Sequence, residues 1–566
     1  MFWQTKTSYE FGPFLVDARE RQLLRDGKPV PLTPKVFDVL LVLAQNSGHI
    51  LSKDELMKLV WPDTAVEEGN LARNISTLRR ALGETSGRHE YVETIPWRGY
   101  RFAAEVKEVR DSRAGPQMES IAVLPFVNVA ADPNLEYLSD GITESLIDNL
   151  SQLTALKVMS RNSVFRYKEC EAHAQTVGRE LNVQAVLMGR VAQRGDLLSV
   201  SVELVDARDD AHIWGAQYSR HPADIYTMQQ NIAQEIAVNL RFNMTQDEKQ
   251  RIVRHRTDNT EAYHLYLKGR FFFNKLTMEG VKKAIAHFEQ AIERDSHYAL
   301  AYCGLVDGHN YLGDTAAAKK AATKALELDQ TLGEAHASLA FHRFIYDWDF
   351  AGAETEFKQA LELNPNYAEA HHWYAIYLAN MGRHDQALPL AKRAVELDPL
   401  SPLMNMTPAL ASYLARRYDE AVDALRKIIE MEPGFMVAHS VLGNVYVQKG
   451  MYGEAMAEYQ KVLELSKGVP VVAATMKAVI AHAYARRGKE STARKILAEI
   501  IDQTGMSPHF IAEIYGALGE KDLAFEWLDK AYAQHDMQMV SLRVNPTLDG
   551  LRSDSRFADV LQRVGL

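Results

Sequence analysis

Residues 66–102 read VEEGNLARNISTLRRALGETSGRHEYVETIPWRGYRF, and this stretch decides the fold of the first part of the chain. It predicts an amphipathic helix over Asn70–Leu82, followed by a two-stranded hairpin with Gly99 at its turn. The apolar residues of the helix recur at offsets 0, 4, 7 and 11 and form one stripe. They are Leu71, Ile75, Leu78 and Leu82.

The opposite face of this helix is cationic and rich in hydrogen-bonding groups. It carries Arg73, Asn74, Thr77 and Arg80. Arginine can donate two hydrogen bonds to guanine and asparagine can pair with adenine, so such a face suits a major groove. The neighbouring Arg79 is expected at a phosphate. Charge and polarity alone would favour a solvated helix face, and the order of the surrounding elements decides for DNA contact.

The preceding residues place this helix in a recognisable order. Short strands are predicted over Tyr9–Asp17, Gln22–Arg25 and Lys28–Leu32. Thr33-Pro34 opens one helix, and Ser52 with Glu55 forms a capping box that opens a second. A small sheet, three helices and a terminal hairpin together make a winged helix-turn-helix.

Three motifs carry a family resemblance across the first hundred residues. They are LTPKVFDVLLVLAQNSGHILSKDELMKLVWPD at 32–63, NISTLRRALGE at 74–84 and VETIPWRGYRF at 92–102. They resemble the OmpR/PhoB-type winged-helix domain. The resemblance implies that Arg73, Asn74, Thr77 and Arg80 read DNA. The wing adds Arg98 at its tip and Arg101 beside it. Tyr100 and Phe102 are expected to pack, and Trp97 is expected either to pack or to touch the DNA backbone.

The resemblance also bears on control. Response regulators of this family carry a phosphorylatable receiver domain before the winged helix, whereas this sequence opens at the winged helix, so we expect no control by aspartyl phosphate. The order looks like the ToxR/CadC/HilA-like branch. In the wider family the loop before the third helix can touch RNA polymerase. Here that loop carries Asp63, Glu67 and Glu68.

The remaining chain divides into a linker and two further segments. We assign 1–106 to the DNA-binding domain, 107–119 to a linker, 120–245 to an α/β domain and 260–566 to a repeat domain. In the α/β segment SIAVLPF, EYLSDGITESLIDNLSQL and GRELNVQAVLMGRV resemble a TolB-N-like module, which implies no particular chemistry.

The last segment is periodic. Alanines recur at intervals of 34 or 35 residues, at Ala284, Ala318, Ala353, Ala387, Ala421 and Ala455. This period, with small residues where two helices touch, is that of the tetratricopeptide repeat. We expect about eight helix pairs in an all-α superhelix, capped by the C-terminal tail. The groove of such an array would present His372, Asn380, Asn444 and Gln448, either as solvated surface or to a peptide or small ligand.

Composition excludes several classes. The net charge is −10, so a DNA site must be a local basic patch. Two cysteines exclude a disulfide scaffold and favour a reducing cytoplasm. We find no signal peptide, membrane span, enzyme signature or metal-binding motif, and expect neither a metal nor another cofactor.

The sequence therefore predicts a cytoplasmic, sequence-specific transcriptional regulator that is not an enzyme. Its expected partners are promoter DNA, RNA polymerase and an unidentified protein or peptide at the repeats, with two copies on adjacent sites. An alternative is an interaction scaffold whose winged helix docks on protein. Catalysis in the middle segment stays open as a third reading.

Overall fold

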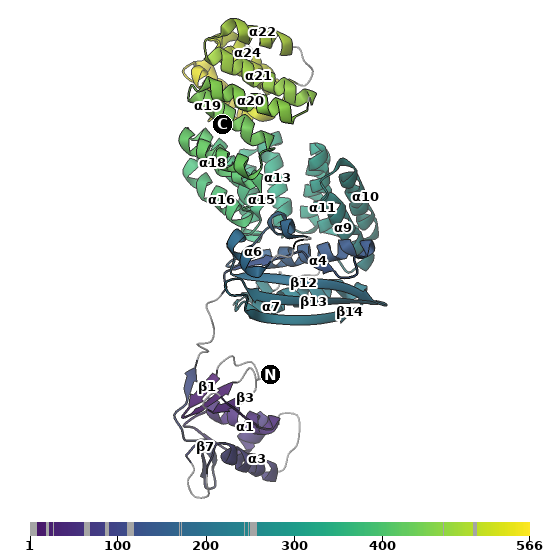
Figure 1. The fold of residues 1–566 in the computed structure, drawn as a ribbon, viewed down its shortest axis with the longest axis vertical. Helices are drawn as coiled ribbons and strands as arrows, with labels where there is room; N and C mark the ends of the chain where they lie inside the picture. Colours follow the sequence, from purple (N-terminus) through teal and green to yellow (C-terminus); the bar gives the residue numbers. More distant parts are fainter. Residues whose placement is uncertain are drawn as a thin grey trace. The chain divides into compact units, whose positions relative to one another are not determined.

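The chain forms two compact units, Met1–Gln117 and Met118–Leu566. The computed structural model describes residues 8–17, 22–25, 28–61, 68–84, 90–109, 118–168, 170, 173–242, 244–246, 248–249, 257–467, 469–501 and 506–566. Figure 1 colours both units along the sequence. The sequence predicts separate middle and repeat domains, and the structure packs these two segments into the second unit.

The described residues of the first unit form two antiparallel sheets and three helices. The larger sheet has the strand order β4-β3-β2-β1-β8 and the smaller one β5-β7-β6. The strands are β1 Ser8–Phe11, β2 Phe14–Asp17, β3 Gln22–Arg25, β4 Lys28–Val30, β5 Ile50–Leu51, β6 Val92–Ile95, β7 Gly99–Phe102 and β8 Lys107–Val109. The helices are α1 Pro34–Gln45, α2 Lys53–Val60 and α3 Glu68–Ala81.

Helix starts in this unit follow from local chemistry. The predicted capping box at Ser52 is confirmed, because its hydroxyl accepts a hydrogen bond from the Glu55 amide and Glu55 accepts one from the Ser52 amide. Thr33 occupies the N-cap of α1 with extended backbone, but its side chain makes no capping bond. Helix α1 is the central core element and packs against both α2 and α3.

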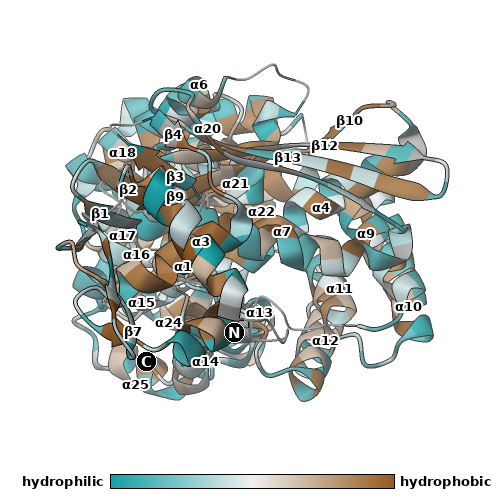
Figure 2. Cartoon of the chain, turned by 90° about the horizontal axis from the view of Figure 1, so that it is seen from below, coloured by the Kyte–Doolittle hydropathy of each residue, from teal (hydrophilic) through white to brown (hydrophobic). Residues whose placement is uncertain are grey.

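The middle segment is built on a mixed sheet with the order β11-β9-β12-β13-β14, and β10 pairs with β12. The strands are β9 Ser120–Val123, β10 Val127–Asn128, β11 Lys157–Val158, β12 Ala185–Arg194, β13 Leu197–Asp206 and β14 His212–Arg220. Strand β9 runs parallel to its neighbours, whereas β12, β13 and β14 form an antiparallel meander. The helices are α4 Pro133–Ser151, α5 Arg161–Val164, α6 Ala174–Leu181 and α7 Ile225–Asn239. Hydrophobic residues recur along β12 and β13 in Figure 2.

Eight helix pairs follow in the described part of the chain. They are α9 Thr260–Phe273 with α10 Met278–Arg294, α11 Ala299–Leu312 with α12 Thr315–Leu328, α13 Gly333–His342 with α14 Phe350–Leu363, α15 Ala368–Asn380 with α16 His384–Leu397, α17 Pro402–Leu414 with α18 Tyr418–Met431, α19 Met436–Gln448 with α20 Tyr452–Leu465, α21 Pro470–Arg486 with α22 Glu490–Ile500, and α23 Pro508–Ala517 with α24 Lys521–Ala533. The repeat alanines are fully buried on the second helix of each pair, for example Ala387 and Ala421. This confirms the predicted repeat, because a small side chain lets the helix axes approach closely.

The repeats pack directly on the middle segment. The Asn366 amide nitrogen lies 2.8, 3.0 and 3.2 Å from three carbonyl oxygens at the end of α4 and in the loop after it. Arg270 of α9 donates to the Glu144 carboxylate of α4 at 2.5 and 2.8 Å. Burial alone would raise the pKa of Glu144, but Arg270 and Arg161 outweigh it and hold that pKa below its usual value. These buried contacts join the two segments.

The C-terminal tail closes the repeat array on itself. It comprises the 3₁₀ turns η4 Met537–Ser541 and η5 Pro546–Leu551 and helix α25 Ser555–Val564. His535 stacks on Trp348 with ring centroids 3.7 Å apart, and Asp549 accepts a hydrogen bond from Arg416 at 2.6 Å. The last repeats therefore contact repeats that precede them by more than a hundred residues.

Candidate nucleic-acid interface and repeat cavity

Helix α3 is oriented by its apolar stripe. Leu71 and Leu78 are fully buried, and Ile75 is almost so. This stripe packs into the core formed by α1 and the strands. The helix cannot rotate without exposing these side chains, so the opposite face is fixed toward the surface.

The surface of α3 carries most of the predicted DNA-reading residues. Arg73, Thr77 and Arg80 are exposed and Asn74 is half-buried. The Asn74 amide donates to the Asn70 carbonyl at 2.8 Å, and the Thr77 hydroxyl donates to the Arg73 carbonyl at 3.0 Å. Pairing of Asn74 with a base therefore requires a change of rotamer that releases this carbonyl.

Arg79 lies on the inner side of the helix end. Its guanidinium donates to the Val92 carbonyl at 2.7 and 3.0 Å and to the Thr94 hydroxyl at 2.8 Å. The carboxylate of Glu84 lies 3.5 Å from it and accepts from the Val92 amide at 3.0 Å. The sequence predicts a phosphate contact for Arg79. In the structure its guanidinium instead joins α3 to strand β6.

The turn of the wing exposes the side chains of Trp97 and Arg98. Trp97 has a φ of 65° and a fully exposed side chain, so it does not pack, which is one of its two expected roles. The neighbouring Arg98 is exposed too. Gly99 begins β7 just after the turn, with a φ of 136°, and a Cβ there would lie 2.0 Å from the Leu51 carbonyl oxygen. Only glycine lets β7 approach β5 so closely.

The remaining wing residues brace the hairpin. Tyr100 and Phe102 are buried, which confirms their predicted packing role. Arg101 faces Glu93 across the β6–β7 pair and donates to its carboxylate at 2.6 and 3.0 Å. This guanidinium is partly neutralised within the wing, whereas Arg98 lies at its tip.

The loop predicted to contact polymerase is almost wholly outside the described residues. Asp63 and Glu67 lie outside them, and of Glu68 the structure gives only its backbone position as the first residue of α3.

The four predicted groove residues differ in how deeply the structure buries them. His372 is buried and bonds to the Thr407 hydroxyl at 2.5 Å, and burial lowers its pKa to about 4. Asn380 is also buried and donates to the Ile376 carbonyl. Asn444 accepts from the Tyr459 hydroxyl at 2.7 Å, and Gln448 is half-buried. These side chains are less solvated than an open groove implies, because the first helices of neighbouring repeats pack closely.

Asn380 and Asn444 line a cavity of about 250 Å³ inside the repeat array. It is bounded by the first helices α15, α17, α19, α21 and α23 and by the segment 537–547 of the tail. Sequence reasoning missed His482 and Glu513, which also line it. Both lie on the first helices of the last two pairs, α21 and α23, and the packing of these helices in the array brings them to the cavity.

The described residues contain no cluster of three or more histidine, cysteine, aspartate or glutamate side chains able to hold a metal ion. None of the described helices is long and apolar enough to cross a membrane.

Comparisons with known protein families divide the chain into three parts. Residues 27–102 match the family described as transcriptional regulatory protein, C terminal. Residues 117–235 match the second domain of HilA/YgeH-like transcriptional regulators, where the sequence suggests a TolB-N-like module. Residues 356–388 and 409–470 match tetratricopeptide repeats.

Individual proteins also resemble the chain. Transcriptional regulator HilA of Salmonella typhimurium is 26% identical over 419 residues, covering 72% of this chain and 73% of HilA. A Rhizobium meliloti protein named "Putative adenylate cyclase 3" is 30% identical over 281 residues, covering 48% of this chain but only 42% of that protein. The solved DNA-binding domain of E. coli CadC is 33% identical, covering 18% of this chain and 97% of that domain, with a TM-score of 0.17.

Proposed function

We propose that this chain, a transcriptional regulator of the HilA and CadC type with a DNA-binding domain and tetratricopeptide repeats, reads promoter DNA with α3. In this proposal α3 lies in the major groove. Arg73 and Arg80 donate to base edges, Thr77 contacts a base or phosphate, and Asn74 pairs with an adenine after its rotamer changes.

The observation that carries the proposal is the fixed orientation of α3. Its buried stripe leaves an outward face with two exposed guanidinium groups, Arg73 and Arg80. Phosphates attract such a face without regard to sequence, and base edges can then discriminate between sequences. The overall charge of −10 makes a local basic face the relevant feature.

The wing supplies a second contact. Arg98 at its tip binds phosphate or the minor groove, and the exposed Trp97 lies against the sugar-phosphate backbone. Arg79 holds the wing against α3 by donating to the Val92 carbonyl. A phosphate contact by Arg79 must therefore share the guanidinium donors with this carbonyl. Arg101 contributes less because Glu93 already pairs with it.

The remaining assignments complete the proposed regulator. Two copies bind adjacent DNA sites in the cytoplasm. The loop with Asp63, Glu67 and Glu68 faces RNA polymerase, and the second unit senses a protein or small ligand. Regulation here requires no catalysis by this chain.

Fluorescence anisotropy of the full-length protein with labelled promoter DNA tests the contacts. Arg73→Ala and Arg80→Ala should each cost about 1–3 kcal/mol of specific binding. Arg98→Ala should weaken binding to all sequences and reduce the salt slope by about 1. Lys107→Ala, an exposed cation on β8, is the matched control and should leave specificity unchanged. Unchanged binding in all three arginine variants would refute the assignment.

A further inference from the structure

The cavity inside the repeat array has an apolar body. Its walls include Ile376, Leu410, Val441, Val479 and Phe510, contributed by five successive first helices. Its volume of about 250 Å³ has room for on the order of eight water molecules at liquid density. A concave site with apolar walls and a few polar groups is the usual form of a small-molecule pocket.

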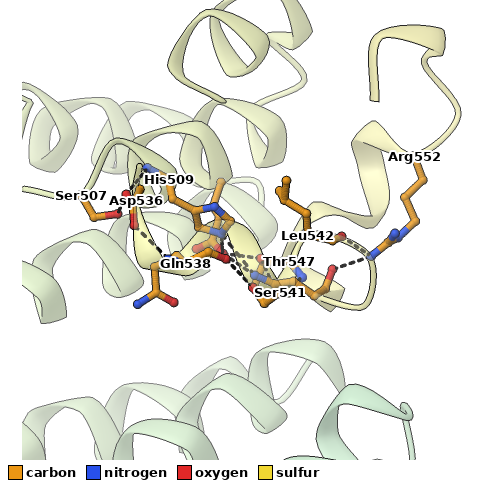
Figure 3. Close-up of polar contacts among 10 residues, drawn as sticks. Ser507, His509, Asp536, Gln538, Ser541, Leu542, Thr547 and Arg552 are labelled. Carbon is orange, nitrogen blue, oxygen red and sulfur yellow. Dashed lines mark hydrogen bonds and ion pairs between the residues drawn. The ribbon is translucent and has the colours of Figure 1, made fainter. Parts of the chain in front are cut away.

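One end of the cavity is polar and organised around Glu513. The Thr547 hydroxyl donates to Glu513 Oε1 at 2.6 Å, and the Asn545 amide donates to the same oxygen at 2.8 Å. His509 Nε2 lies 3.2 Å from it. Figure 3 shows His509 and Thr547 within this network, which links α23 to the tail. All of these contacts hold one oxygen of the carboxylate in place.

Glu513 pairs with a histidine at this end of the cavity, because His509 Nε2 lies 3.2 Å from its carboxylate. Burial alone would raise the pKa of Glu513, but hydrogen bonding from His509 and the positive potential of His509 and His482 hold it below its usual value. Burial lowers the pKa of His482. Among the residues that line the cavity there is no lysine or arginine. The wall therefore presents a carboxylate that has histidine neighbours, with no arginine or lysine among the lining residues.

A second observation points to a ligand. His482 is 97% buried and lines the cavity, yet its Nε2 atom has no hydrogen-bond partner in the structure. A buried polar atom without a partner costs about 1–3 kcal/mol, so a donor or acceptor inside the cavity would recover that cost.

We propose that this cavity binds a small organic cation, a primary amine on an apolar body, with Glu513 as its anchor. The ammonium group donates to Glu513, the apolar body packs on Val479 and Phe510, and His482 Nε2 accepts a hydrogen bond from the ligand. An anion is excluded by the carboxylate. A peptide that runs through the cavity is excluded because residues of the tail form one side of it.

The tail connects this site to the rest of the array. Gln538, Ser541 and Asn545 line the cavity, and Asp549 of the same tail pairs with Arg416 on α17. A ligand in the cavity would therefore contact the tail directly. The regulatory consequence of this contact rests on the proposed function, whereas binding itself does not.

Isothermal titration calorimetry of the full-length protein tests the site, with 2-phenylethylamine as the probe. The uncharged 2-phenylethanol and the anionic phenylacetate are its matched controls. We expect saturable binding of the amine and at least about tenfold weaker binding of both controls. Glu513→Gln should weaken amine binding by about tenfold or more, because the charge-assisted hydrogen bond is lost.

Two further variants keep the test decisive. Glu499→Gln removes an exposed carboxylate of α22 that pairs with Lys477, and should bind the amine as the parent does. Val479→Phe narrows the cavity without changing its charge and should also abolish amine binding. This variant still tests the site if Glu513→Gln fails to fold. Equal binding of amine and alcohol, undiminished binding in folded Glu513→Gln, or no binding of the amine would overturn the proposal. DNA titrations of the same samples show separately whether the proposed function fails.

Discussion

Replacing Arg79 by alanine should separate the role of this residue in holding the wing from any role at DNA. Its guanidinium makes three hydrogen bonds to strand β6, two to the Val92 carbonyl and one to the Thr94 hydroxyl. Its guanidinium also lies 3.5 Å from the Glu84 carboxylate, and the Glu84 side chain is only 2% exposed. The substitution would leave a buried carboxylate and a carbonyl without this partner.

The expected loss of stability follows from these contacts. A hydrogen bond to a charged group contributes about 1.5–3 kcal/mol, and breaking a buried ion pair costs about 3–5 kcal/mol. The Arg79 side chain is 19% exposed and the pair is not in closest contact, so the lower end of the second range applies. We expect the first unit to lose about 3 kcal/mol, or about 1–3 M in its urea midpoint.

Hydrogen exchange of the full-length protein in increasing urea measures this, because peptides from α3 and β6 report on the first unit alone. Arg73→Ala is the control and should change stability by less than about 0.5 kcal/mol, since its side chain is exposed. DNA affinity of the Arg79 variant should fall equally for specific and unrelated sequences. Parent-like protection of β6 in Arg79→Ala would show that this contact does not hold the wing.

Three further substitutions test the packing. Burial lowers the pKa of His372 to about 4 from 6.5, so the unfolded state protonates first, and stability that is complete above pH 6.5 is lost as the pH falls toward 4. His372→Asn should remove up to about 1.4 kcal/mol per pH unit of that loss, measured by urea unfolding at pH 4.5 and 7.5; an unchanged pH slope would count against it. Gly99→Ala should cost about 3 kcal/mol and expose β5 and β7 to hydrogen exchange, because its Cβ meets the Leu51 carbonyl; normal protection would contradict this clash. Asn366→Ala should lower the stability of the second unit by about 2 kcal/mol, and an unchanged urea midpoint would show that its bonds to the middle segment contribute little.

The parts of the fold that depend on local sequence could be predicted. The period of Leu71, Ile75 and Leu78 requires one buried helix face, and the structure buries all three. The Ser52 capping box involves residues only three apart, and it forms as predicted. The repeat alanines follow from the same kind of regularity, because each unit repeats the contacts of the last.

Contacts between distant residues could not be predicted from one sequence. Arg79 is an arginine on a basic helix, and only the placement of β6 shows that its guanidinium is directed inward. The sequence places His372 on a groove surface, but the closeness of neighbouring first helices buries it. Glu513 lines a cavity together with residues of four other first helices and of the tail, an arrangement that no local pattern encodes.

Selection of DNA from a random pool by the full-length protein tests the central claim most directly. A regulator that reads bases with α3 should enrich one motif, and the double variant Arg73→Ala, Arg80→Ala should lose or relax that motif at the positions these residues contact. The Lys107→Ala control should enrich the same motif as the parent. Failure of the parent to enrich any motif would contradict DNA reading by α3 and favour a scaffold whose winged helix docks on protein.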